Sequence, residues 1–120
     1  VAKVIPALKG KLDGFAMRVP VPDGSAVDLT AILSRPAPKE VIDSAFKSWS
    51  EGPLHGILEY CNEPIVSSDV IGNNHSSIYD SLASMAMGNM VKIVAWYDNE
   101  WGYSVRIVDL VQKIAEVNNW

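Results

Sequence analysis

The chain has 120 residues, enough for one domain with a real core but too few for both a dinucleotide-binding domain and a substrate domain. With 48% hydrophobic and 20% charged residues, the composition is that of an ordinary globular protein. The net charge of −4 offers no basic surface and argues against nucleic acid as a dedicated partner.

The first quarter of the chain predicts a connection followed by two strands. Residues 8–14 hold two glycines between apolar stretches, which is typical of a connection. Residues 15–19 alternate so that Phe15, Met17 and Val19 share one face of a predicted strand, with Arg18 on the other. After a turn at residues 20–24, the alternation resumes over residues 25–33. The two strands are predicted to pair antiparallel.

From Pro38 the spacing of apolar residues becomes that of a helix of about three turns. Asp43 and Lys47 are expected to pair on its exposed side, and Gly52 followed by Pro53 predicts its end. The apolar face, which is expected to pack on the sheet, consists of Val41, Ile42, Ala45, Phe46 and Trp49.

The middle of the chain is predicted to be mostly irregular, with short apolar segments at 57–60 and 64–66 and a strand at 78–80. Residues 84–87 fit either a strand or a helical turn, and both alternatives stay open. An apolar run at 90–96 leads to a final helix whose apolar stripe is Ile107, Leu110, Val111, Ile114 and Val117. The pattern predicts one α+β domain over residues 1–120, with a mixed, largely antiparallel sheet and helices packed on one face.

The candidate binding residues lie at the junction of the last apolar run and the last helix, which reads Trp-Tyr-Asp-Asn-Glu-Trp-Gly-Tyr-Ser over residues 96–104. The Asn99 amide both donates and accepts, so it can orient another amide. Tyr103 would project from the same face one turn later, where its ring can pack on a flat ligand. Two alternatives stay open: Asp98 and Asn99 only cap the helix, and Tyr103 packs in the core.

Arg18 is a candidate for binding an anion, because its guanidinium is a planar fork of donors that matches phosphate or carboxylate. The alternative is a surface arginine paired with a nearby carboxylate.

Other reactive side chains predict no further site. The spacing of Cys61 from the two histidines does not favour a thiolate–imidazole pair, and a lone cysteine is more often a small buried hydrophobe. The three methionines at positions 85, 87 and 90 are expected to fill gaps in a core, and no metal is implied. The chain has no Gly-x-Gly-x-x-Gly motif, so any dinucleotide must be held largely elsewhere.

Several features bear on where the chain works. No apolar run approaches the ~20 residues of a membrane span, and the start lacks the layout of a signal peptide. The single cysteine excludes an internal disulfide and suits a reducing compartment. A cytoplasmic location without membrane partners is therefore expected. Because no initiator methionine is present, the chain is expected to be part of a longer polypeptide or a processed product.

Six segments carry a resemblance to a known family. They read Val-Ile-Pro-Ala-Leu-Lys-Gly-Lys-Leu (4–12), Phe-Ala-Met-Arg-Val-Pro (15–20), Ser-Glu-Gly-Pro-Leu (50–54), Val-Ser-Ser-Asp (66–69), His-Ser-Ser (75–77) and the junction at 96–104. In this order they resemble phosphorylating glyceraldehyde-3-phosphate dehydrogenase over essentially the whole chain. The resemblance covers the C-terminal part of the catalytic domain and leaves out the dinucleotide-binding domain.

The resemblance implies roles for three residues. The arginine of the family's Arg-Val-Pro strand binds substrate phosphate and inorganic phosphate, a role that falls to Arg18. The asparagine of the Tyr-Asp-Asn-Glu motif holds the nicotinamide carboxamide and the tyrosine that follows packs near it, roles that fall to Asn99 and Tyr103. The family's catalytic cysteine stands in Ser-Cys-Thr-Thr, which does not occur here, and Cys61 in Glu-Tyr-Cys-Asn is not given its role. No catalytic residue is therefore expected in this chain.

For the full-length protein, the resemblance implies a glycolytic enzyme that converts glyceraldehyde 3-phosphate and inorganic phosphate to 1,3-bisphosphoglycerate with NAD or NADP. It also implies a homotetramer, whereas the 120 residues alone are expected to be inactive. The nearest rival is erythrose-4-phosphate dehydrogenase. A rival from another class is a non-catalytic interaction or scaffold module, since apolar surface would be exposed where a missing part packs.

Overall fold

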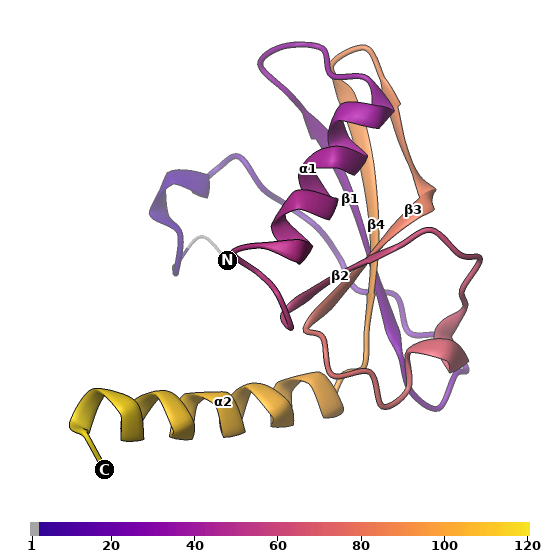
Figure 1. The fold of residues 1–120 in the computed structure, drawn as a ribbon. Helices are drawn as coiled ribbons and strands as arrows, with labels where there is room; N and C mark the ends of the chain where they lie inside the picture. The colour runs from indigo at the N-terminus through magenta and orange to yellow at the C-terminus, as the bar shows by residue number, and fades with distance from the viewer. Residues whose placement is uncertain (1–2) are drawn as a thin grey trace.

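A computed structural model describes residues 3–120, within which four strands and two α-helices form (Figure 1). In chain order the elements are the 3-10 helix η1 (Pro6–Leu8), β1 (Ser25–Ile32), α1 (Lys39–Glu51), β2 (Leu58–Cys61), the 3-10 helix η2 (Ser67–Val70), β3 (Ser77–Met87), β4 (Met90–Tyr97) and α2 (Trp101–Asn118).

The four strands form one sheet in the order β1-β4-β3-β2. β4 pairs antiparallel with both β1 and β3, whereas β2 pairs parallel with β3. The register between β3 and β4 shifts between Asp80 and Met85, where an irregularity separates the two halves of β3. The predicted α+β class with a mixed, largely antiparallel sheet is therefore confirmed.

The strand predicted over residues 15–19 is wrong, and so is its pairing with the next strand. These residues are irregular, and the apolar side chains of Phe15 and Met17 are 86% and 73% exposed. The predicted second strand does form as β1, but it pairs with β4. Alternation makes a strand only where the backbone finds a partner, and residues 15–19 find none within residues 3–120. The segment left open at 84–87 is strand, the end of β3.

Helix α1 packs on the sheet through an aromatic contact. The Phe46 ring stacks on the fully buried Tyr79 of β3 at a centroid distance of 4.0 Å. The Tyr79 hydroxyl donates to Asp43 at 2.7 Å, and burial raises the pKa of this hydroxyl above its usual value. Asp43 is paired with Lys39 at 2.6 Å, so its predicted pairing with Lys47 on the exposed side is wrong. The reason is that Asp43 turns toward the sheet to accept from the buried tyrosine.

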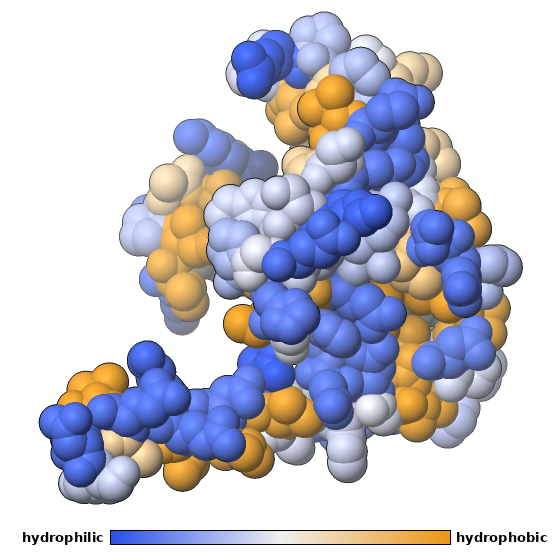
Figure 2. All heavy atoms as spheres, viewed as in Figure 1, coloured by the Kyte–Doolittle hydropathy of each residue, from blue (hydrophilic) through white to orange (hydrophobic). Residues whose placement is uncertain are grey.

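Several apolar residues that the pattern assigned to a core are exposed. On α1, Ile42 and Phe46 are half-buried but Val41 and Trp49 are exposed, and Met85 and Met87 of β3 are exposed as well. The predicted final helix is confirmed as α2, but it leads away from the sheet, so the expected packing of helices on one face is met by α1 and not by α2 (Figure 1). Its apolar stripe is exposed, and Figure 2 shows apolar surface along it. None of the described helices is long and apolar enough to cross a membrane.

The turn before β1 is held against η2 by a close backbone approach at Gly24. Gly24 is buried and has φ of +84°, in the left-handed region that favours glycine. A Cβ at this position would lie 2.7 Å from the carbonyl oxygen of Ser67 in η2. The glycine therefore permits both the turn and its contact with η2.

We expect Gly24→Ala to lower the free energy of unfolding of the full-length protein by about 2–5 kcal/mol, because left-handed strain and a backbone clash add. Gly10→Ala is the matched control, since Gly10 has φ of +73° but nothing within 4 Å of its Cβ position. This control should lose about 1 kcal/mol. Urea denaturation measures both, and equal losses would show that the contact with η2 contributes nothing.

Candidate functional site

The carboxylate of Asp98 holds the turn between β4 and α2. Its Oδ1 accepts the backbone N–H of Glu100 at 3.0 Å and of Trp101 at 2.7 Å, and its Oδ2 accepts the N–H of Gly72 at 2.9 Å. The side chain is 4% exposed. Asp98 thus accepts the N–H of Trp101, the first residue of α2, which is the capping contact that one of the sequence alternatives proposed, although the N-cap residue itself is Glu100. Asp98 also ties the turn to the loop at residues 71–76, which follows η2.

These three donors explain the charge state of Asp98. Hydrogen bonds from backbone N–H groups lower the pKa of the carboxyl group below its usual value, because each bond stabilises the ionised form. The N–H of Gly72 has the largest effect, followed by that of Trp101. Burial works in the opposite direction and is outweighed. Asp98 is therefore an anion at neutral pH.

Asn99 lies inside the ring that the Asp98 carboxylate closes. The bonds from Oδ1 to the N–H groups of Glu100 and Trp101 span Asn99, so its backbone is held in an Asx turn. Its side chain is exposed, and no hydrogen bond between residues of the range 3–120 uses its amide. The structure therefore holds the backbone of Asn99 and leaves its amide at the surface.

The first turn of α2 rests on the loop at residues 71–76. Gly102 is buried, and a Cβ there would lie 3.0 Å from the carbonyl oxygen of His75, so the helix approaches the loop backbone closely. The Trp101 indole donates to the Asn74 side chain at 2.6 Å. Tyr103 is 69% exposed, so the alternative in which it packs in the core is wrong. Asn99, in the turn before α2, and Tyr103, in its first turn, are thus both exposed near the start of this helix.

Arg18 does not lie on a strand, as the sequence predicted, but in an irregular and exposed segment. Within residues 3–120 it forms no ion pair, so the surface-pair alternative is not realised there either. Among residues 3–120, no hydrogen bond or ion pair joins Arg18 to the turn that carries Asn99.

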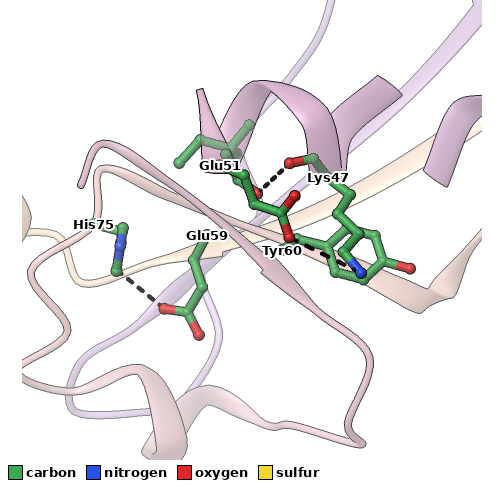
Figure 3. Close-up of a pocket in the computed structure, with 7 residues that line it drawn as sticks. Lys47, Glu51, Glu59, Tyr60 and His75 are labelled. Carbon is green, nitrogen blue, oxygen red and sulfur yellow. Dashed lines mark hydrogen bonds and ion pairs between the residues drawn. The ribbon is translucent and has the colours of Figure 1, made fainter. Parts of the chain in front are cut away.

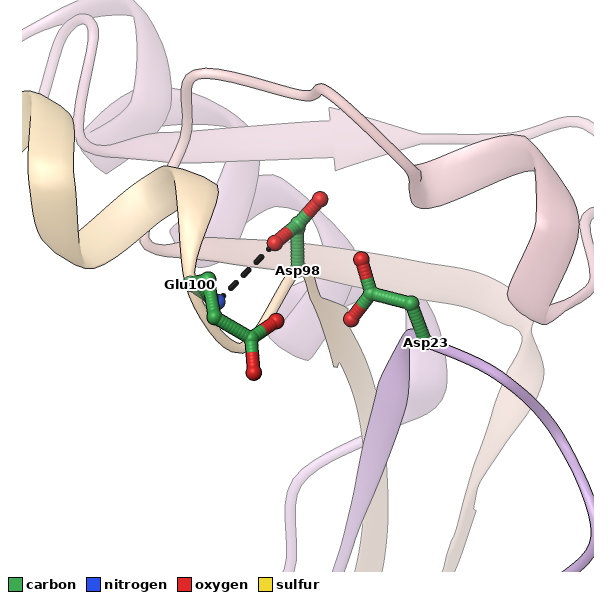
Figure 4. A group of neighbouring side chains, drawn as sticks. All are labelled: Asp23, Asp98 and Glu100. Carbon is green, nitrogen blue, oxygen red and sulfur yellow. Dashed lines mark hydrogen bonds between the residues drawn. The ribbon is translucent and has the colours of Figure 1, made fainter.

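Asp23 brings a second segment to this turn. Carboxylate oxygens of Asp23, Asp98 and Glu100 lie within 4.8 Å of one another (Figure 4). The negative charge of Asp23 raises the pKa of Glu100, which is exposed. Both oxygens of Asp98 already accept N–H groups, and Oδ1 of Asp23 accepts the N–H of Gly24 at 2.7 Å, so Oδ2 of Asp23 and the carboxylate of Glu100 remain for a cation. Sequence reasoning missed this neighbourhood, because no spacing rule connects positions so far apart.

A polar cluster fastens the loop at residues 71–76 to β2. The Nδ1 atom of His75 lies 3.0 Å from a carboxylate oxygen of Glu59 (Figure 3). It also lies 2.9 Å from the side-chain oxygen of Asn73, whose amide donates to the same Glu59 oxygen at 2.8 Å. His75 is thereby engaged away from Cys61, whose thiol donates to the Glu63 carbonyl at 3.6 Å. Among residues 3–120, no hydrogen bond joins Cys61 to His55 or His75. An open hollow of about 260 Å³ adjoins the cluster, lined by Lys47, Ser50, Glu51, Leu58, Glu59, Tyr60 and His75.

An α+β sheet with an anchored strand-to-helix turn is compatible with many functions, and comparison with known proteins narrows them. Residues 1–99 match the family described as glyceraldehyde 3-phosphate dehydrogenase, C-terminal domain. The chain belongs to this family.

Curated relatives carry the same name. The chain is 57% identical to a glyceraldehyde-3-phosphate dehydrogenase of Mycobacterium avium over 94% of its length and 33% of the relative's. It is 54% identical to glyceraldehyde-3-phosphate dehydrogenase 1 of Schizosaccharomyces pombe over 99% of its length and 36% of the relative's. A cytosolic glyceraldehyde-3-phosphate dehydrogenase of Ginkgo biloba is 55% identical over 96% of the chain and 34% of that protein. The chain spans about a third of the length of these relatives.

The role of Asp98 in the fold predicts a specific dependence of stability on pH. Because its folded-state pKa is lowered, the ionised group stabilises the fold fully above its unfolded pKa of about 4 and loses this effect as pH falls through the lower folded value. Asp98→Asn should therefore lower the free energy of unfolding at pH 7 by about 1–3 kcal/mol, a difference that shrinks below about pH 4.

Thermal unfolding of the full-length protein from pH 7 to pH 3 measures this difference. Asp13→Asn is the control, since Asp13 is exposed and, among the residues from 3 onward, accepts only from its neighbour Gly14. It should change stability by less than about 0.5 kcal/mol. A deficit of Asp98→Asn that is the same at every pH would contradict the assignment.

Proposed function

We propose that the chain forms the C-terminal part of the catalytic domain of a phosphorylating glyceraldehyde-3-phosphate dehydrogenase. The observation that carries the proposal is 54–57% identity to proteins of that name over 94–99% of the chain. In the full-length protein, glyceraldehyde 3-phosphate, inorganic phosphate and NAD⁺ or NADP⁺ give 1,3-bisphosphoglycerate, the reduced dinucleotide and a proton. The dinucleotide, when bound, accepts the hydride.

Asn99 is the residue of this chain that orients the nicotinamide. Its amide is exposed, and its backbone is held by the Asx turn, so donor and acceptor face outward from a fixed base. An amide pairs well with the carboxamide of nicotinamide, because each supplies one donor and one acceptor. The exposed ring of Tyr103 stands one turn further along α2 and supplies an apolar surface beside it.

Arg18 binds phosphate, either that of the triose or the attacking inorganic phosphate. Its guanidinium is exposed and has no carboxylate partner within residues 3–120, so it is available to bind an anion. No residue of the chain serves as nucleophile, since its single cysteine stands outside the family's cysteine motif. Arg18, Asn99 and Tyr103 thus bind and orient, and the bond-making groups belong to the rest of the full-length protein.

The proposal extends to assembly and location. The full-length protein acts as a homotetramer in the cytoplasm, without membrane or dedicated nucleic-acid partners. The Ginkgo relative is named cytosolic, which supports the location. The exposed apolar stripe of α2 supports burial against further protein, because large apolar patches are seldom left in water.

Substitution of Asn99 and of Arg18 in the full-length enzyme should change the kinetics toward different substrates. Asn99→Ala should raise the KM for NAD and lower kcat, whereas Arg18→Gln should raise the KM for phosphate and for triose phosphate. Loss of a charge-assisted contact predicts a change of about tenfold to a hundredfold in kcat/KM for phosphate. Arg35→Gln, at another exposed arginine, is the control and should leave both unchanged. An Arg18→Gln enzyme with an unaltered KM for phosphate would contradict the assignment.

The 120 residues alone should show no dehydrogenase activity, because they lack the family's nucleophilic cysteine and activating histidine. The assay combines the purified chain with glyceraldehyde 3-phosphate, NAD⁺ and phosphate, and follows absorbance of NADH. The full-length enzyme at the same molar concentration is the positive control. NADH formation above a protein-free blank would contradict this expectation.

A further inference from the structure

We propose that Asp98 is a positioning residue for Asn99, setting the direction in which the Asn99 amide faces the nicotinamide; this inference rests on the proposed function. Asp98 touches neither substrate nor cofactor in this proposal. It acts by fixing the one turn on which Asn99 stands.

The first support is that Asp98 holds both ends of this turn. Its own side chain is buried, and its Oδ1 binds the two N–H groups that immediately follow Asn99. Figure 4 shows the bond between Asp98 and the N–H of Glu100, and Asn99 is the one residue between these two in the sequence. A rotation of the Asn99 backbone would have to break these bonds.

The second support is that Asp98 ties the turn to an independently fixed part of the fold. Its Oδ2 accepts from Gly72, in the loop that the Glu59, Asn73 and His75 cluster fastens to β2. The close contact of Gly102 with His75 brings α2 onto the same loop. Without Asp98, the start of α2 would keep this contact but lose the bond that sets the turn before it.

The third support is that the position needs a carboxylate. Three N–H donors converge on the side chain, two on one oxygen and one on the other. An asparagine would present a single acceptor oxygen, and its NH₂ would face a donor, so either Gly72 or the start of α2 would lose its partner. Asp98→Asn therefore removes the positioning contact while keeping size and shape.

The test uses the full-length enzyme, in which displacement of Asn99 by a fraction of an ångström should be visible in rate. We expect Asp98→Asn to lower kcat/KM for NAD about tenfold to a hundredfold and to leave the KM for phosphate unchanged. Asp13→Asn is the matched control, because it makes the same change at an exposed carboxylate outside this turn, one that accepts the N–H of its neighbour Gly14, and it should behave as wild type.

A double-variant cycle distinguishes positioning from a general effect on structure. If Asp98 acts through Asn99, adding Asp98→Asn to Asn99→Ala should cause no further loss in kcat/KM for NAD. Losses that multiply, or an equal rise in the KM for phosphate, would overturn the inference. An Asn99→Ala enzyme with normal NAD kinetics would overturn the proposed function as well, so the two failures are distinguishable.

Folding of the variants is checked by circular dichroism. If Asp98→Asn does not fold, Asp98→Ser takes its place, because serine still offers an acceptor to the start of α2 but cannot reach Gly72 as aspartate does. The double-variant cycle is then run with Asp98→Ser and Asn99→Ala, and positioning again predicts no further loss in kcat/KM for NAD. Failure of both variants to fold would overturn the inference, since Asp98 would then serve folding rather than orientation.

Discussion

The buried carboxylate of Asp98 is the interaction on which the rest of the candidate site depends. Three backbone N–H groups from two segments converge on it, and they stabilise its charge enough to lower its pKa despite burial. The Asp98 side chain follows the end of β4, binds the first N–H of α2, and connects this turn to the loop before β3 through Gly72. The direction of α2 and the presentation of Asn99 both follow from this arrangement.

The fold divides into a part that is packed and a part that is exposed. Tyr79, Phe46 and the four-stranded sheet form a small core. The apolar stripe of α2 and residues 15–19 are exposed to solvent. These exposed surfaces are understandable in a chain that spans about a third of its relatives' length. Arg18 stands in the exposed part, and Asn99 stands where the packed part ends.

Local patterns predicted whatever a single element decides by itself. The helical spacing before Gly52 and the stripe from Ile107 onward correctly predicted α1 and α2, and Asp98 was recognised as a cap. Pairing across the chain could not be predicted, because residues 15–19 have the alternation of a strand but no partner among the described residues. The same limit applies to the site: motif resemblance led to Asn99, but no pattern connects position 98 with Gly72 or with Asp23. Their proximity depends on how β4 and η2 are placed, which is a property of the whole sheet.

A crystal structure of the full-length protein with NAD and phosphate would test the central claim most directly. The account predicts the Asn99 amide within hydrogen-bonding distance of the nicotinamide carboxamide, with the carboxylate of Asp98 still bound to the N–H groups of Gly72 and Trp101. It also predicts phosphate on the Arg18 guanidinium. A nicotinamide held by other residues, with the Asn99 side chain turned away, would contradict it.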